Sequence, residues 1–90
     1  MEYLNRVEII GSVEKGVMTR VSDKAAVRIS VAVRNDDNVD TFNVFAVEGG
    51  KIRKEVLTSL EVGESVSVIG RLKPIGLSYE IVAQELEVIG

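Results

Sequence analysis

The sequence predicts an all-β fold, a five-stranded barrel with one short helix between the third and fourth strands. Three observations lead to this prediction. Valine and isoleucine number 24 against 6 leucines, and β-branched side chains fit a pleated sheet better than a helix. Five segments are predicted as strands, and three of them alternate apolar and other residues with the period of a strand. One segment has the four-residue period of a helix.

The first strand is expected over residues 5–13, where Val7 and every second residue after it face one side. Gly11 lies among these residues and predicts a bulge or a bend. Residues 17–21 form either a separate short segment or a continuation of the bent first strand, before the turn signal Ser22-Asp23.

The second and third strands are expected to form a hairpin. Residues 25–34 have the clearest alternation, and a polar, turn-prone segment at 35–38 leads into a third strand at 39–47. A one-residue slip of register exchanges the two faces of the third strand. Phe45 faces outward if Val44 faces inward, and is buried in the other register. We favour the outward orientation.

The only helix is expected over residues 51–62, where apolar residues recur every four positions. Gly63 follows at a place where a helix C-terminus favours a left-handed residue. Residues 64–73 alternate again and give the fourth strand, and Pro74-Ile75-Gly76 ends it. The last strand is expected over residues 77–89.

The apolar strand faces predict a barrel interior, with the helical segment closing one end. The predicted interior residues are Val7, Ile9, Val27, Ile29, Val31, Val33, Val66, Val68, Leu72 and Ile81, with Ile52, Val56 and Leu60 from the helical segment.

The order of elements matches the oligonucleotide-binding fold, or OB-fold, a small and partly open five-stranded barrel. A ferredoxin-like fold needs two helices, and an SH3-like barrel lacks a helix of about 12 residues between its strands. The chain has no internal repeat and no linker, so residues 1–90 are expected to form a single domain, since domains span roughly 100–200 residues.

The composition argues against an enzyme. The chain has no cysteine and no histidine, which removes disulfides, thiolate nucleophiles, zinc clusters and the usual base at neutral pH. Residues 36–40 have the spacing of a calcium loop, but Thr41 and Val47 replace its required Gly and Glu. Gly49-Gly50-Lys51 lacks the spaced Gly and the Ser or Thr of a phosphate loop. We therefore expect no metal and no cofactor.

The chain shows no feature that directs a protein to a membrane. It has no secretory start and no apolar run approaching the ~18 residues of a membrane span, so a cytoplasmic protein is expected.

Five segments together resemble bacterial single-stranded-DNA-binding proteins and the primosomal replication protein derived from them. The opening Asn5-Arg6-Val7-Glu8-Ile9-Ile10-Gly11 resembles their first strand. Residues 41–47, 51–63 and 66–72 resemble the third strand, the barrel helix and the fourth strand, and residues 83–89 resemble the last strand. The joint order of the motifs carries the resemblance.

The resemblance implies that extended single-stranded DNA lies across the outer barrel face, without sequence preference, with phosphates on Lys and Arg and bases stacked on aromatic rings. DNA or RNA is left open. The positions that match are Arg6 in the first strand, Arg28 and Arg34 in the second, Phe45 in the third, Arg71 and Lys73 in the fourth, and Tyr79 near the last hairpin.

The resemblance also implies a role in DNA replication, recombination or repair, with replication proteins as candidate partners. Family members pair first strands between subunits, and Ile10 leaves an aliphatic group on the outer face of this strand. We therefore expect a homodimer, or a tetramer built from dimers.

Several features depart from the family pattern and favour weak binding. The net charge is −3 and Trp is absent, and the family's third-strand aromatic positions are Asn43 and either Val47 or Gly49 here. The acidic balance and the few stacking aromatics support an alternative function, an OB-fold protein–protein interaction module that does not bind nucleic acid. The distribution of charge favours nucleic-acid binding: because no Lys or Arg follows Lys73, the negative charge is expected to be concentrated in the last strand, and the earlier strands are less acidic.

Overall fold

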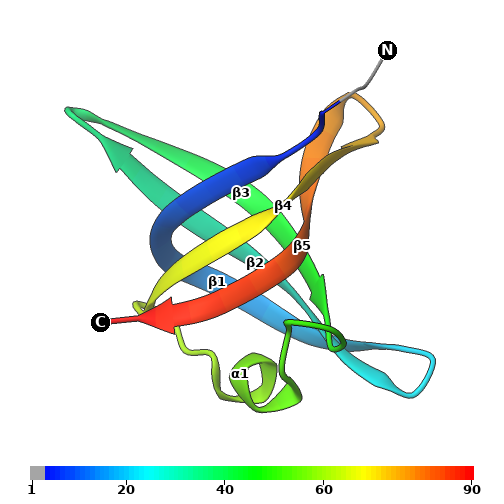
Figure 1. Cartoon of the computed structure of the whole chain (residues 1–90). Helices are drawn as coiled ribbons and strands as arrows, with labels where there is room; N and C mark the ends of the chain where they lie inside the picture. The colour runs from blue at the N-terminus through cyan, green and yellow to red at the C-terminus, as the bar shows by residue number, and fades with distance from the viewer. Residues whose placement is uncertain (1–3) are drawn as a thin grey trace.

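The computed structural model describes residues 4–90, which form a closed barrel of five strands with the neighbour order β1-β2-β3-β5-β4. The elements are β1 (Val7–Val21), β2 (Lys24–Asn35), β3 (Asn38–Val47), α1 (Lys54–Ser59), β4 (Ser65–Ile75) and β5 (Ser78–Ile89). In Figure 1 the helix α1 lies below the barrel, and the β1–β2, β2–β3 and β4–β5 hairpins extend from the barrel. The predicted all-β OB-fold, with its helix between the third and fourth strands, is confirmed.

Strand β1 is long and takes part in both halves of the barrel. Residues 7–12 pair with β4, and residues 12–21 pair with β2, so residues 17–21 continue the first strand. The register with β2 shifts between Val13 and Lys15, so Glu14 is the extra residue of a β-bulge. One extra residue inverts the alternation of faces. Odd-numbered side chains therefore face inward before the bulge, and even-numbered ones after it.

The bulge in β1 lies at Glu14 and not at Gly11. A Cβ atom on Gly11 would lie 2.2 Å from the carbonyl oxygen of Ala32. Gly70 in β4 has the same relation to the carbonyl oxygen of Val82, also at 2.2 Å. Both glycines thus permit a close backbone approach that a side chain would prevent.

The core lies inside the barrel and against α1. It consists of Val13, Val27, Ile29, Val31, Val44, Ala46, Ile52, Leu57, Val66, Val68, Ile81, Ala83 and Leu86, and Val7, Ile9, Val33, Phe42, Val56 and Leu60 pack around it. All but one of the predicted interior residues belong to these two groups.

The exception is Leu72, which is 38% exposed although it follows the inward alternation of β4. The last backbone pair between β1 and β4 is Val7 with Gly70. Leu72 therefore lies beyond the part of β4 that β1 covers. The prediction that Leu72 lies in the interior is wrong for this reason.

The helix is shorter than the predicted segment 51–62. Gly49 and Ile52 exchange two backbone hydrogen bonds of 2.9 Å, so the chain makes a tight turn before α1. Arg53 and Leu60, which flank α1, are both extended. Gly63 has a φ of +96° but does not cap the helix: its N–H donates to the carbonyl of Val13 at 2.7 Å. It directs the chain back into the barrel.

Two hairpins bound the outer face that β2 and β3 present. The predicted hairpin of β2 and β3 is confirmed, with Asn35 paired to Asn38 at its turn. The hairpin of β4 and β5 turns between Ile75 and Ser78. In Figure 1 these two hairpins extend from opposite sides of the barrel at its upper end. Within residues 4–90, no helix is long and apolar enough to cross a membrane.

Candidate nucleic-acid interface

One row of outward-facing residues crosses all five strands. Backbone pairing aligns Val17 of β1 with Arg28 of β2, Arg28 with Phe45 of β3, Phe45 with Val82 of β5, and Val82 with Arg71 of β4. The row brings three of the sequence-predicted site residues, Arg28, Phe45 and Arg71, onto one surface.

Phe45 has the outward orientation that the sequence analysis favoured. Its neighbours Val44 and Ala46 are fully buried, and Phe42 packs against the core, so the even-numbered residues of β3 face inward. Phe45 itself is half-buried on the outer side. The guanidinium carbon of Arg28 lies 4.6 Å from the centre of the Phe45 ring, within the range of a cation–π contact.

Arg28 is also ion-paired, with its Nη1 atom 3.1 Å from Oε2 of Glu80. The Arg28 side chain is 58% exposed, whereas that of Glu80 is 9% exposed. The carboxylate compensates the charge of Arg28 and holds its guanidinium over Phe45. This pair also corrects an expectation about charge: Glu80 belongs to the acidic last strand, yet it lies on the surface predicted to bind nucleic acid.

Arg71 and Lys73 lie on the exposed part of β4, and Arg6 lies beside them. Val7 pairs with Gly70, and the Asn5 side chain donates to the carbonyl of Leu72 and accepts from its N–H, both at 2.9 Å. These contacts place Arg6 opposite Arg71. Arg6 also forms a long, exposed ion pair with Glu8 at 3.8 Å, whereas Arg71 and Lys73 form no ion pair with any residue in 4–90.

Arg34 is separate from the other predicted cations. It faces Val39 near the tip of the β2–β3 hairpin, a segment that also carries Asp36, Asp37 and Asp40. Three carboxylates against one guanidinium make this tip acidic. The structure therefore does not join Arg34 to the cations of β4.

A pocket of about 340 Å³ lies between the outer face of β1, β2 and β3 and the β4–β5 hairpin. Tyr79, which is 63% exposed, is one wall of this pocket. The other lining residues are Lys15, Gly16, Val17, Arg28, Ile29, Ser30, Asn43, Val44, Ile75, Ser78 and Glu80. The pocket therefore combines an aromatic ring, apolar groups, a lysine and a carboxylate.

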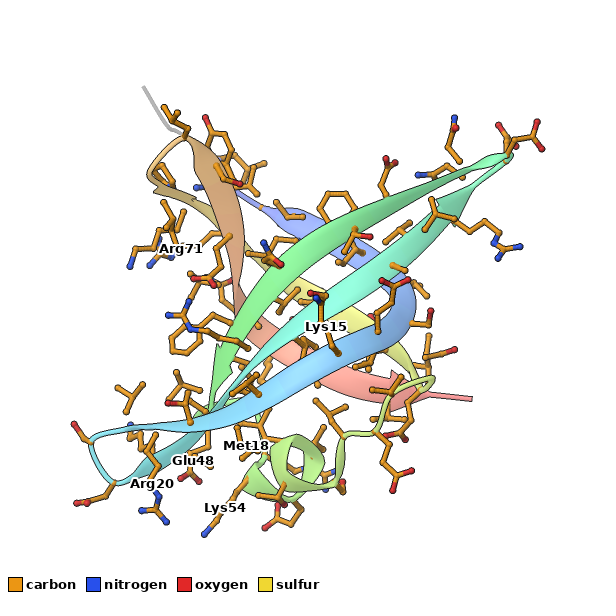
Figure 2. The ribbon with its side chains drawn as sticks, turned by 180° about the vertical axis from the view of Figure 1, so that it is seen from behind. Lys15, Met18, Arg20, Glu48, Lys54 and Arg71 are labelled. Carbon is orange, nitrogen blue, oxygen red and sulfur yellow. The ribbon has the colours of Figure 1, made fainter. Side chains whose placement is uncertain are left out.

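Sequence reasoning missed Lys15, which Figure 2 shows on the face of β1 near the middle of the sheet, with Arg71 at one side. The sequence places Lys15 between the predicted first strand and residues 17–21, and leaves open whether the strand continues through it. The bulge at Glu14 carries β1 onward and turns Lys15 outward, opposite Ser30. Gly16 is the one local signal, since a glycine inside a strand often marks a bulge.

Sequence reasoning also missed Ser30 and Glu80 as parts of the pocket. The hydroxyl of Ser30 donates to Oδ1 of Asn43 at 3.4 Å, a long bond across β2 and β3. Residues 4–90 contain no group of three or more acidic side chains placed to hold a metal ion. The chemistry that the surface offers is cation, aromatic ring and hydrogen bond.

No family model and no curated protein sequence matches the chain. Solved structures do match it. The single-stranded DNA binding protein from Thermus aquaticus has a TM-score of 0.79 at 25% identity, over 97% of this chain and 41% of that one. The small single-stranded DNA-binding protein from Streptomyces coelicolor has a TM-score of 0.74 at 25% identity, over 93% of this chain and 91% of that one.

The dimeric N-terminal domain of PriB from Thermoanaerobacter tencongensis has a TM-score of 0.74 at 17% identity, over 96% of this chain and 97% of that one. The chain thus spans less than half of the Thermus protein but nearly all of the two smaller ones. The resemblance predicted from the sequence is confirmed: the chain has an OB-fold similar to those of bacterial single-stranded-DNA-binding proteins and PriB.

Proposed function

We propose that this chain binds single-stranded DNA without a defined sequence, on a surface that we call the binding face. The binding face consists of Lys15, Arg28, Phe45, Arg71, Lys73 and Tyr79. The observation that carries the proposal is the likeness to the Thermus aquaticus single-stranded DNA binding protein over 97% of this chain.

The chemistry of the binding face supports the proposal. Lys15, Arg71 and Lys73 are exposed cations that phosphates can approach. Phe45 and Tyr79 offer aromatic rings on which bases of any sequence can stack. Because the chain carries a net charge of −3 and Arg28 is already paired with Glu80, few cations remain to attract a polyanion. Binding should therefore be weak, and log affinity should fall with log salt by about 0.7 for each of the few phosphates that these cations neutralise.

A role in DNA replication, recombination or repair in the cytoplasm follows from this proposal. The chain would act there by occupying single strands and by contacting replication proteins, and not as a catalyst. Selection of DNA over RNA requires a contact at the sugar, because the 2′-hydroxyl distinguishes the two.

We further propose that the chain forms a homodimer, or a tetramer of dimers, through β1. Residues 7–10 pair with β4 on one side, and on the other side they pair with no strand among residues 4–90. Ile10 in this segment is 61% exposed. An open strand edge with an exposed aliphatic group is prone to association, and pairing with a second copy removes it. The similar PriB domain is dimeric.

A second candidate function is a protein-interaction module that does not bind nucleic acid. Two observations favour it: Glu80 compensates Arg28, and Arg34 lies on an acidic hairpin. Both remove cations that the sequence had assigned to DNA. A surface with few free cations and exposed apolar groups such as Val17 and Ile75 is also suited to protein contacts.

A fluorescence-anisotropy titration of labelled oligo-dT, about 30 nucleotides long, separates these functions, since one OB-fold occupies roughly 4–16 nucleotides. At low salt we expect a saturating rise in anisotropy that added salt reverses. A duplex of the same length should bind less, because its bases cannot stack on Phe45 and Tyr79. No rise at low salt would refute DNA binding and favour the interaction module.

A further inference from the structure

A buried carboxylate lies in the wall of the pocket on the binding face. Glu80 is 7% exposed and is adjacent to Tyr79 in β5. Its Oε2 atom accepts a hydrogen bond from Nη1 of Arg28 at 3.1 Å. Neither the phosphate cations nor the stacking rings of the proposed function use this group.

The second carboxylate oxygen of Glu80 remains available to a ligand. No donor within residues 4–90 forms a hydrogen bond to Oε1. Among residues 4–90, every fully buried side-chain nitrogen or oxygen atom has a hydrogen-bond partner, so Oε1, which has none, is not fully buried. It must therefore retain contact with solvent, and Glu80 lines the pocket. The free acceptor is accessible from the pocket.

The charge of Glu80 determines which part of a nucleotide fits beside it. Although Arg28 compensates the charge of Glu80, Oε1 can only accept a hydrogen bond, as phosphate oxygens also do, so a base edge that carries a donor and not the backbone should approach Oε1. Cytosine, adenine and guanine carry exocyclic amino groups that donate to an acceptor, and a carboxylate is a recognised partner of the cytosine N4 amino group. Thymine has a single N–H between two carbonyl oxygens, which the carboxylate repels.

The rest of the pocket fits a nucleotide in this orientation. Tyr79, which has an exposed ring, lines the same pocket as Glu80, and Lys15 lines it as a cation for a phosphate. The amide of Asn43 and the hydroxyl of Ser30 add polar groups on the opposite strands. A volume of about 340 Å³ is sufficient for one base with its sugar.

We propose that Glu80 is a specificity-determining residue, which favours bases with an exocyclic amino group, cytosine first, over thymine at this one position. The inference rests on the proposed function and refines it, since the remaining contacts do not distinguish sequence. The preference is modest because a single hydrogen bond carries it.

Glu80→Gln is the variant that tests the inference. Its amide has the size of the carboxylate but can present a donor in place of an acceptor. Glu85→Gln is the matched control, because it removes the same charge from the same strand, β5. Glu85 pairs with Lys51 at 3.3 Å and does not line the pocket. Affinities for dC and dT oligomers of about 15 nucleotides are measured by anisotropy, near the upper end of one OB-fold site.

We expect Glu80→Gln to lower the affinity for the dC oligomer relative to the dT oligomer by about five- to tenfold, the value of one hydrogen bond. Glu85→Gln should raise the affinity for the dC oligomer and for the dT oligomer by the same factor, so that the ratio of the two affinities stays unchanged. Unchanged ratios in both variants overturn the inference while single-stranded DNA binding stands. Failure of the wild-type chain to bind either oligomer refutes the proposed function and this inference with it.

Amide NMR spectra of the wild-type chain provide a second test that does not depend on a variant. Added dCMP should shift the amide signals of Ser30, Asn43 and Tyr79 at concentrations where dTMP shifts them little. Equal shifts with both nucleotides overturn the inference.

Discussion

Charged side chains on the binding face differ in how much charge they offer to a ligand. Arg28 contributes an exposed guanidinium, but Glu80 compensates its charge and the Phe45 ring stacks against it. Lys15 and Arg71 have no carboxylate within ion-pair distance among residues 4–90. Arg28 therefore acts mainly by positioning and stacking, whereas Lys15 and Arg71 should carry the phosphate contacts.

Replacing Lys15 and Arg71 together by Ala should flatten the dependence of log affinity on log salt. Each phosphate contact that is lost changes the slope by about 0.7 for single strands, so loss of both cations should change it by roughly 1.4. Lys54→Ala serves as the control, because Lys54 lies on α1, outside the binding face (Figure 2). A slope that stays the same in the double variant contradicts this role.

Phe45→Ala should weaken binding with little change in the salt slope, because stacking releases no counterions. The expected loss is roughly 1–3 kcal/mol, the usual contribution of one stacked base. Anisotropy titrations at two salt concentrations give both quantities. Equal affinities of the variant and the wild-type chain would show that no base stacks on this ring.

Only part of the binding face could be predicted residue by residue. The outward orientation of Arg28 and Arg71 follows from the alternation of their strands, whereas the sequence allows two orientations for Phe45. The pairing of Arg28 with Glu80 joins residues 52 positions apart, and no local pattern signals it. Lys15 was missed because a bulge that changes the facing of a strand leaves only a weak trace in the sequence.

At the scale of elements, the strands were predictable because their periodicity results directly from burial. In β2, the alternating valines and Ile29 are buried or partly buried, while Arg28 and Arg34 are exposed. The helix was overpredicted because Ile52 and Leu60 have helical spacing but lie outside α1. Both residues lie in the segments that connect α1 to the strands and pack into or against the core, and a spacing pattern cannot distinguish such residues from helical ones.

Two residues that were predicted to lie in the interior, Val31 and Leu72, should differ in how well they tolerate a charge, because Leu72 lies beyond the part of β4 that β1 covers. Val31 is fully buried, so Val31→Asp would place an unpaired carboxylate in the core and should prevent soluble folding. Leu72→Asp should fold, because Leu72 is exposed beyond the last pair with β1. Circular dichroism and thermal unfolding compare the two. A folded Val31→Asp variant contradicts the assignment of faces.

At the scale of the whole molecule, closure of the barrel leaves the first half of β1 as an open edge. Sedimentation of the wild-type chain at micromolar concentration should give a dimer or a tetramer, and Ile10→Lys should shift it toward a monomer by placing a charge at the edge. Val39→Lys controls for the added charge, since Val39 is also an exposed aliphatic residue but lies in the β2–β3 hairpin and not at this edge. A monomeric wild-type chain would contradict pairing through β1.

The central claim concerns the whole outer surface, and NMR mapping with unlabelled oligo-dT at low salt tests it most directly. The account predicts that amide signals of Lys15, Arg28, Phe45, Arg71 and Tyr79 shift progressively, while those of α1 and of the last residues of β5 stay in place. Shifts confined to α1 and the end of β5, or no shifts at all, would contradict the assignment of the binding face.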